Sequence, residues 1–380
     1  MKPSFLFIFA ATLAALPLCA ATEPEVWFGP PHAAPRALVA PGARWPTVQQ
    51  NLDTLQFAIN AVAFLIPQDD LRQLTALLQR NRIRISVECG YFDWEPTQTD
   101  FDAPNPKPIT DRVHKAVTRG IGRRTARVEL AKIKPLLDAG GVPDYLVLDG
   151  PVRRMIHPGA DTGRIPPHGV AEGLATVDEA IEEMIEYMRE WRARFPEIRF
   201  LPLANFPNWG WKGGPAYWAS GPDAMYWGDY HPVIQKILTQ TQAAKMPVAG
   251  IVIDSPFEYT MGVMPVGPPW PKPAKDPKET DWLARLLDLE RTIRAHGVDV
   301  SLIVNSQTGG HESDEAFRRE TLRYLETYRQ AGGQARRYVF QSWYKHPERM
   351  EPEDDPNTMA GMLREALRVV KGNRKPTALR

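Results

Sequence analysis

The sequence predicts a (β/α)8 barrel, a closed parallel sheet of eight strands surrounded by helices. Three observations lead to this prediction. Short apolar runs alternate eight times with longer segments whose apolar residues recur at helical spacing. The runs are apolar on both faces, which is typical of parallel strands covered by helices. The chain of 380 residues has the right size for eight such units in one barrel.

Each expected strand is a short run rich in Val, Ile, Leu and Phe. DYLVLDGP and AGIVIDSP show the pattern, with three or more apolar residues running into an aspartate. The expected strands cover residues 25–31, 55–60, 83–90, 144–151, 199–206, 249–256, 299–307 and 338–343.

The expected helices lie between these runs, with one more after the last. Thr176 and Asp314 are suited to open a helix, and Gly140, Gly297 and Gly332 stand just past expected helix ends. The expected helices cover residues 46–54, 68–80, 124–139, 176–194, 230–245, 279–296, 313–331 and 357–371.

The connections are of two lengths. Those from helix to strand are short, whereas four of those from strand to helix are long and rich in Pro, Gly and Trp, at 91–123, 151–173, 207–228 and 256–278. Long loops in a compact domain are usually functional, and these fall on the C-terminal face, where barrel active sites lie. We find no linker, and expect one barrel domain over residues 22–380.

The first 21 residues have the three parts of a secretory signal peptide: Lys2, an apolar run and the small residues Ala20 and Ala21. The mature protein is therefore expected to be secreted or periplasmic in a bacterium. Cys89 would then be the only cysteine, so no intramolecular disulfide is expected. A net charge of +1 with scattered basic residues favours neither nucleic acid nor a membrane surface as a partner, and no protein partner is implied.

Polar side chains end almost every expected strand. Residues at these ends point into a shared mouth although they are far apart in sequence. The ring consists of His32, Asn60, Glu88, Asp149, Asn205, Asp254, Asn305 with Gln307, and Gln341 with Trp343.

Two carboxyl groups across a pocket are what glycoside hydrolysis requires. We assign Asp149 as nucleophile or base and Asp254 as acid, with Glu258 as a rival acid and Glu88 as a third carboxylate that binds sugar or tunes the pair. Alternatively, each strand-end residue caps the next helix or makes an Asx turn. Function is favoured for the two aspartates, because Gly150 and Ser255-Pro256 follow them and no helix is expected to start immediately after them.

Aromatic residues gather in the long loops. A tryptophan ring is a flat apolar plate suited to a sugar ring, although some of these rings must pack the loops themselves. The residues expected to bind substrate are His32, Glu88, Asn205, Trp209, Trp211, Trp227, Trp270, Asn305, Gln307, Gln341 and Trp343.

Other chemistries have less support. No GxSxG, HExxH, P-loop or GxGxxG after a strand occurs, so no cofactor is expected. The alternatives to a glycoside hydrolase are a non-catalytic glycan-binding barrel and a metal-assisted hydrolase in which Glu88, Asp149 and Asp254 hold a divalent cation.

With Asp149 ending strand four in YLVLDGP and Asp254 ending strand six in GIVIDSP, the chain resembles the barrel glycosidases of the alpha-galactosidase and alpha-glucosidase type. In those enzymes these two strand ends carry nucleophile and acid/base, so the resemblance implies the same roles here. The sequence departs from retaining β-glycosidases with Asn-Glu at the end of strand four and Glu at the end of strand seven, where Asp149-Gly150 and Asn305 stand. The resemblance is architectural and names no single family.

Overall fold

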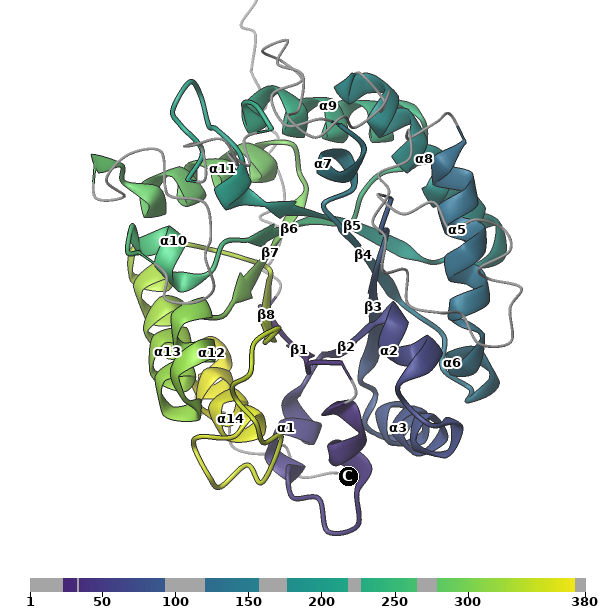
Figure 1. The fold of residues 1–380 in the computed structure, drawn as a ribbon, viewed down its shortest axis with the longest axis vertical. Coiled ribbons are helices and arrows are strands. Elements are labelled where there is room, and N and C mark those ends of the chain that lie inside the picture. Colours follow the sequence, from purple (N-terminus) through teal and green to yellow (C-terminus); the bar gives the residue numbers. More distant parts are fainter. Residues whose placement is uncertain are drawn as a thin grey trace, which may run out of the picture.

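The computed structural model describes residues 23–32, 34–92, 120–156, 176–217, 227–264 and 279–372. Eight parallel strands close into a barrel in chain order, and β8 pairs with β1. Figure 1 shows the strands as a central ring with the helices around it. The predicted (β/α)8 barrel is confirmed.

All eight expected strands are present, shifted by at most a few residues. Their bounds are β1 Glu25–Gly29, β2 Thr54–Ala58, β3 Arg84–Cys89, β4 Tyr145–Asp149, β5 Arg199–Asn205, β6 Gly250–Asp254, β7 Asp299–Val304 and β8 Arg337–Gln341.

The expected helices are present as well, one of them in two parts. The helix expected over 124–139 divides before Lys134, and Pro135 lies in the first turn of the second part. The helices are α1 Pro46–Asn51, α3 Gln68–Asn81, α5 Ile121–Lys132, α6 Lys134–Asp138, α8 Val177–Arg194, α9 Tyr230–Ala243, α11 Trp282–Ala295, α13 Asp314–Gln330 and α14 Met359–Lys371.

Six short helices among the described residues were not expected. One or two turns contain too few residues to show a helical period. Most of the six follow strand ends, where they set the direction of the chain beside the mouth. They are 3-10 helices η1 Ala34–Val39 and η3 Phe206–Asn208, and α2 Ile59–Phe64, α7 Pro151–Met155, α10 Phe257–Met261 and α12 Gln307–Glu312.

The barrel interior is filled by every second residue of the strands, as strand alternation requires. Its middle is apolar and almost fully buried. This apolar layer consists of Trp27, Tyr145, Val147, Leu201, Leu203, Val252, Ile303 and Val339. Six of the eight strands contribute to this layer, which lies between the polar groups at the two ends of the barrel.

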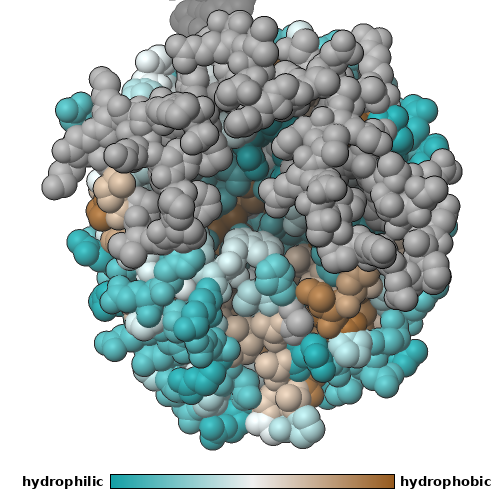
Figure 2. Space-filling view, in the orientation of Figure 1, coloured by the Kyte–Doolittle hydropathy of each residue, from teal (hydrophilic) through white to brown (hydrophobic). Residues whose placement is uncertain are grey.

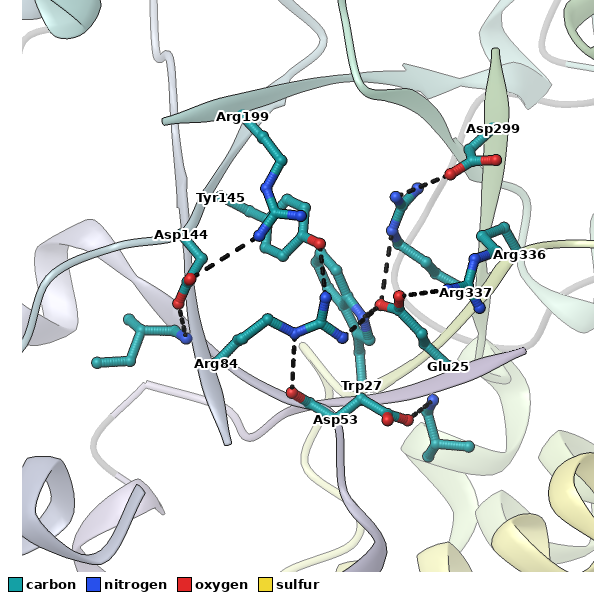
Figure 3. Close-up of polar contacts among 12 residues, drawn as sticks. Glu25, Trp27, Asp53, Arg84, Asp144, Tyr145, Arg199, Asp299, Arg336 and Arg337 are labelled. Atoms are coloured by element: carbon teal, nitrogen blue, oxygen red, sulfur yellow. Dashed lines mark hydrogen bonds and ion pairs between the residues drawn. The ribbon is translucent and has the colours of Figure 1, made fainter. Parts of the chain in front are cut away.

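The N-terminal end of the barrel holds a charged network centred on Glu25 (Figure 3). Glu25 Oε2 lies 2.8 Å from Arg84 Nη2, and Oε1 lies 2.9 Å from Arg336 Nη2. Trp27 Nε1 donates a hydrogen bond of 2.9 Å to Glu25, and Arg337 pairs with Asp299 at 2.9 Å. The network therefore closes the end opposite the strand-end carboxylates.

A second, larger core lies between the strands and the surrounding helices and includes Phe28, Phe57, Leu146 and Ile253. The side chain of Thr176 accepts a hydrogen bond from the backbone of Glu179, so Thr176 caps α8. Within the described ranges, no helix has the length and hydrophobicity that a membrane span requires.

Candidate active site

The C-terminal strand ends carry the polar side chains of the candidate site. Glu88 is in register with Val147, and Asp149 with Leu203, both members of the apolar layer. Partners in register share a face, so both carboxyl groups point into the barrel. In the orientation of Figure 1, the space-filling view is hollowed at the centre of the molecule (Figure 2).

Asp149, the last residue of β4, is ion-paired with Arg154. The guanidinium contacts the Asp149 carboxylate through Nη2 and donates a 2.6 Å hydrogen bond from Nε to the Asp149 carbonyl. The two side chains are only 15% and 14% exposed. Arg154 also lies over the ring of Tyr91, 5.1 Å from its centroid.

Asp254, the last residue of β6, has a different environment. Asn205 Nδ2 donates a 2.9 Å hydrogen bond to Asp254 Oδ2, and Arg153 Nε donates one of 3.0 Å to Asn205 Oδ1. Burial raises the pKa of Asp254 to about 6; the Asn205 hydrogen bond and Arg153 oppose the rise, and the charge of Asp149 adds to it. The two aspartates, at the ends of β4 and β6 on either side of β5, thus have unlike surroundings: one is ion-paired and the other has a raised pKa.

Glu88 is the third carboxyl group of the site and is 4% exposed. Gln56 Nε2 donates to Glu88 Oε2 at 2.9 Å and to Gln341 Oε1 at 3.0 Å. Burial and the charges of Asp149 and Asp254 raise the pKa of Glu88 well above its usual range, and Arg154 opposes this rise. Glu88 therefore keeps its proton to a higher pH than an ordinary glutamate does, and it completes the polar floor.

Short helices do start close behind both aspartates, which corrects the expectation that none would. α7 begins at Pro151 and α10 at Phe257. Neither aspartate caps them, because the residues at the two N-caps are Gly150 and Pro256, and no side-chain cap is formed.

Glu258 is placed differently from the expectation of a rival acid. It is 1% exposed, and its carboxylate accepts hydrogen bonds from Ser306 Oγ at 2.6 Å, Thr308 N at 2.8 Å and Gln307 N at 3.1 Å. These donors lie at the start of α12, where backbone N–H groups lack helical partners. This corrects the expectation: Glu258 fastens α12 to α10 and is not in the proposed pair.

Replacing Glu258 by Gln is expected to lower the free energy of unfolding by about 2–3 kcal/mol, because an amide nitrogen would face backbone donors that now meet a carboxylate. Urea denaturation at pH 7 measures the change. Glu312→Gln, on the exposed side of α12, is the matched control and should change stability by less than about 0.5 kcal/mol. Equal stability of the two variants would contradict the assignment.

Asn305 directly follows β7, Gln307 is the first residue of α12, and both are almost fully buried. Tyr259 donates a 2.5 Å hydrogen bond to Gln307 Oε1. Asn305 Oδ1 and Gln307 Nε2 are buried and have no hydrogen-bond partner among the described residues. Such groups are usually satisfied by water or ligand, so both remain candidates for substrate binding.

Two of the expected sugar platforms are buried instead. Trp209 is 2% exposed and packs on Tyr230, 5.1 Å between ring centroids. Trp211 is 4% exposed, packs on Phe206, and donates from Nε1 to Asp288 at 2.8 Å. This corrects the expectation for both rings, which belong to the larger core between the strands and the helices.

The other expected aromatics have mixed surroundings. Trp343, after β8, is 39% exposed, and its centroid lies 5.6 Å from that of His32 after β1. Trp227 is partly buried, and Arg153 lies 5.3 Å from its centroid. Trp270 lies outside the described residues. Asn60 is exposed on α2, where it accepts a 3.0 Å hydrogen bond from Lys132. It therefore does not belong to the polar residues around the mouth.

Sequence reasoning missed Gln56, Arg153 and Arg154 as site residues. A signal existed for each: Gln56 is a polar residue inside an apolar run, and the two arginines directly follow DGPV. Tyr344, next to Trp343, also reaches the site, since burial and then the charge of Asp254 raise its pKa well above the usual range. Across the described ranges, no group of three or more His, Cys, Asp or Glu residues has the geometry of a metal site.

Comparison with known proteins gives no family. No family model matches the sequence, and no curated protein matches it. Solved structures match the chain at low similarity. An endo-beta1,6-glucanase is 8% identical, with a TM-score of 0.46 over 86% of this chain and 67% of its own. Xylanase B from Clostridium stercorarium F9 is 10% identical, with a TM-score of 0.43 over 86% and 89%.

A putative phosphonomutase from Burkholderia cenocepacia J2315 is 13% identical, with a TM-score of 0.37 over 90% of this chain and 94% of its own. The three proteins carry different activities in their names. Likeness of this degree concerns the barrel alone and does not choose between them.

Proposed function

We propose that this protein is a glycoside hydrolase that cleaves an oligo- or polysaccharide with Asp149 and Asp254. The observation that carries the proposal is the contrast between them: Asp149 is ion-paired with Arg154, whereas the pKa of Asp254 is raised to about 6. Two carboxyl groups with unlike environments supply the base and the acid of such a reaction. The roles are those that the alpha-galactosidase and alpha-glucosidase type implies.

In this mechanism Asp254 donates its proton to the glycosidic oxygen as the bond from that oxygen to the anomeric carbon breaks. Asp149 either attacks the anomeric carbon or takes a proton from the water that attacks it. Glu88, held by Gln56, binds a sugar hydroxyl group or tunes the pair of aspartates. Trp343 and His32 offer a partly exposed aromatic surface at the β8 and β1 side of the mouth.

The proposed location is outside the cytoplasm, because residues 1–21 have the composition of a signal peptide. A carbohydrate polymer that cannot enter the cell is a fitting substrate for an exported enzyme.

The proposal is tested by release of reducing ends from a panel of α- and β-linked gluco-, galacto-, manno- and xylo-oligosaccharides, with and without EDTA. The wild type is expected to act on at least one member without EDTA sensitivity, and an Asp149→Asn/Asp254→Asn double variant on none. Binding without release would favour a glycan-binding barrel. Loss of activity in EDTA would favour a metal-assisted hydrolase, and equal release by the double variant would remove the proposed pair.

The pH dependence of kcat/KM follows from the same assignment. Asp254 must be protonated to act as acid, so kcat/KM is expected to fall as pH rises through about 6. The profile is measured with the responsive glycan between pH 4 and pH 9. Activity that rises through this range would contradict the role of Asp254 as acid.

A further inference from the structure

One turn of helix directly after β4 supplies both arginines of the site. α7 spans Pro151–Met155, and its Arg153 and Arg154 turn to different aspartates. Arg154 contacts Asp149 directly, while Arg153 reaches Asp254 only through Asn205. The chain from Arg153 through Asn205 to Asp254 crosses from α7 over the end of β5 to the end of β6.

The hydrogen bonds of this chain have one consistent direction. Arg153 Nε donates to Asn205 Oδ1 at 3.0 Å, which fixes the Asn205 amide with its nitrogen facing Asp254. Asn205 Nδ2 then donates to Asp254 Oδ2 at 2.9 Å. An asparagine without the arginine could rotate its amide by half a turn and present oxygen to the carboxyl group. The arginine therefore determines which atom of Asn205 meets Asp254.

Gly150 makes room for this arrangement. A Cβ atom at residue 150 would lie 2.7 Å from Asn205 Oδ1 and 3.0 Å from Arg153 Nε, and the residue has φ 56°. The short distances and the positive φ both favour glycine. A side chain would push between the two hydrogen-bonded groups and strain the left-handed backbone. Gly150 therefore leaves the space in which Arg153 and Asn205 meet.

We propose that Arg153 is a positioning residue that acts through Asn205 to orient the carboxyl group of Asp254 and to set the pH at which it gives up its proton. The inference rests on the proposed function in treating Asp254 as the acid. It moves Asn205 from the substrate-binding residues to the support of the acid.

Other charged and titratable groups also face Asp254, and the test must separate them from Arg153. Asp149 raises the pKa of Asp254, and Arg153 lowers it. The groups whose charge interacts with Asp254 are Glu88 on β3, Asp149 on β4, Arg153 on α7, Tyr259 on α10, Tyr324 on α13 and Tyr344 after β8. Among these groups, Arg153 alone is connected to Asp254 through the Asn205 amide.

The test is the titration of Asp254 by NMR of protein labelled with 13C at the aspartate carboxyl carbons. The Asp254 signal is assigned by its loss in Asp254→Asn. The wild type is expected to titrate near pH 6, and Arg153→Met at higher pH by about half a unit or more. Arg153→Lys, which keeps the charge without the Nε donor, should fall between them. An unchanged midpoint in Arg153→Met would overturn the proposal.

A double-mutant cycle distinguishes action through Asn205 from the effect of a remote charge. If Arg153 acts through the amide, the shifts in Arg153→Met and Asn205→Ala are not additive, and the double variant titrates close to Asn205→Ala. Additive shifts would overturn the positioning role. Because the readout is a proton and not product release, an enzyme inactive on every glycan would remove the proposed function and leave this result interpretable.

The shift in the titration of Asp254 should also appear in the kinetics on a glycan that the wild type cleaves. The fall of kcat/KM at alkaline pH should move to higher pH in Arg153→Met, in step with the NMR midpoint, whereas a merely structural defect would lower activity equally at all pH values. A uniform loss would therefore count against the proposal.

Discussion

Asp149→Asn is expected to lower kcat for glycan hydrolysis by on the order of 10³-fold, which is about 4 kcal/mol of transition-state stabilisation. An amide can neither attack the anomeric carbon nor accept a proton from water, so the reaction loses its nucleophile or base whichever of these roles Asp149 has. The fold should survive, because the substitution keeps the shape of the side chain and retains an oxygen for Arg154.

The measurement is the rate at saturating substrate for wild type and variant, with the unfolding temperature recorded for both. Asp144→Asn is the matched control: this aspartate also belongs to the β4 segment but lies at its N-terminal end, where it pairs with Arg199 at 3.8 Å. The control should keep kcat within about twofold, since it is separated from the mouth by the apolar layer. Full activity of Asp149→Asn would exclude it from the reaction.

Glu25→Gln is expected to lower the free energy of unfolding by about 3–5 kcal/mol at pH 7. Glu25 is 6% exposed and faces Arg84, Arg336 and Arg337. Arg337 has Nε and Nη1 buried without hydrogen-bond partners among the described residues, and its charge is compensated by Asp299 at 2.9 Å and by Glu25 at 3.7 Å. Removing one negative charge would leave the buried Arg337 and the partly buried Arg84 and Arg336 opposite a neutral amide (Figure 3).

The pH dependence of this effect has a definite sign. Burial tends to raise the pKa of Glu25, but the Trp27 hydrogen bond and the three arginines together bring it below its ordinary value. A carboxyl group with a lowered folded-state pKa stabilises the protein above its unfolded pKa and loses that contribution as pH falls through the folded pKa. Wild type and Glu25→Gln should therefore differ most near pH 7 and become similar in acid.

Guanidinium denaturation at pH 7 and pH 3 measures both parts of this prediction. Glu326→Gln, on the exposed side of α13, controls for loss of one negative charge and should cost less than about 0.5 kcal/mol. A Glu25 variant as stable as the control at pH 7 would show that the network contributes no net stability.

The fold could be predicted because its signals are long and repeated. Runs such as LVL before Asp149 and IVI before Asp254, separated by helical segments, determine strand order and parallel direction in a way that single residues do not. The single-turn helices α7 and α10 left no period to detect. The partners of the aspartates therefore could not be predicted, since Arg153 and Arg154 reach the site only because α7 turns them back.

The strand-end rule placed Glu88, Asp149, Asp254 and Gln341 at the mouth because alternation along a strand fixes the direction of a side chain. In loops there is no such alternation, so the direction of a side chain cannot be predicted in this way. Composition does not distinguish a buried tryptophan such as Trp209 from a partly exposed one such as Trp343. Glu258 follows Asp254 by four residues in sequence, yet its helix directs it to the start of α12.

The assignment of separate roles to Asp149 and Asp254 is tested most directly by changing the leaving group of the substrate. On the responsive sugar, Asp254→Asn is compared with wild type on the natural glycan and on an aryl glycoside whose phenol leaves without protonation. Asp254→Asn is expected to lose about 10²–10⁴-fold in kcat/KM on the glycan and to keep most of its activity on the aryl glycoside. Asp149→Asn is expected to lose activity on both substrates. Equal losses of Asp254→Asn on both substrates, or no loss on the glycan, would contradict Asp254 as the acid.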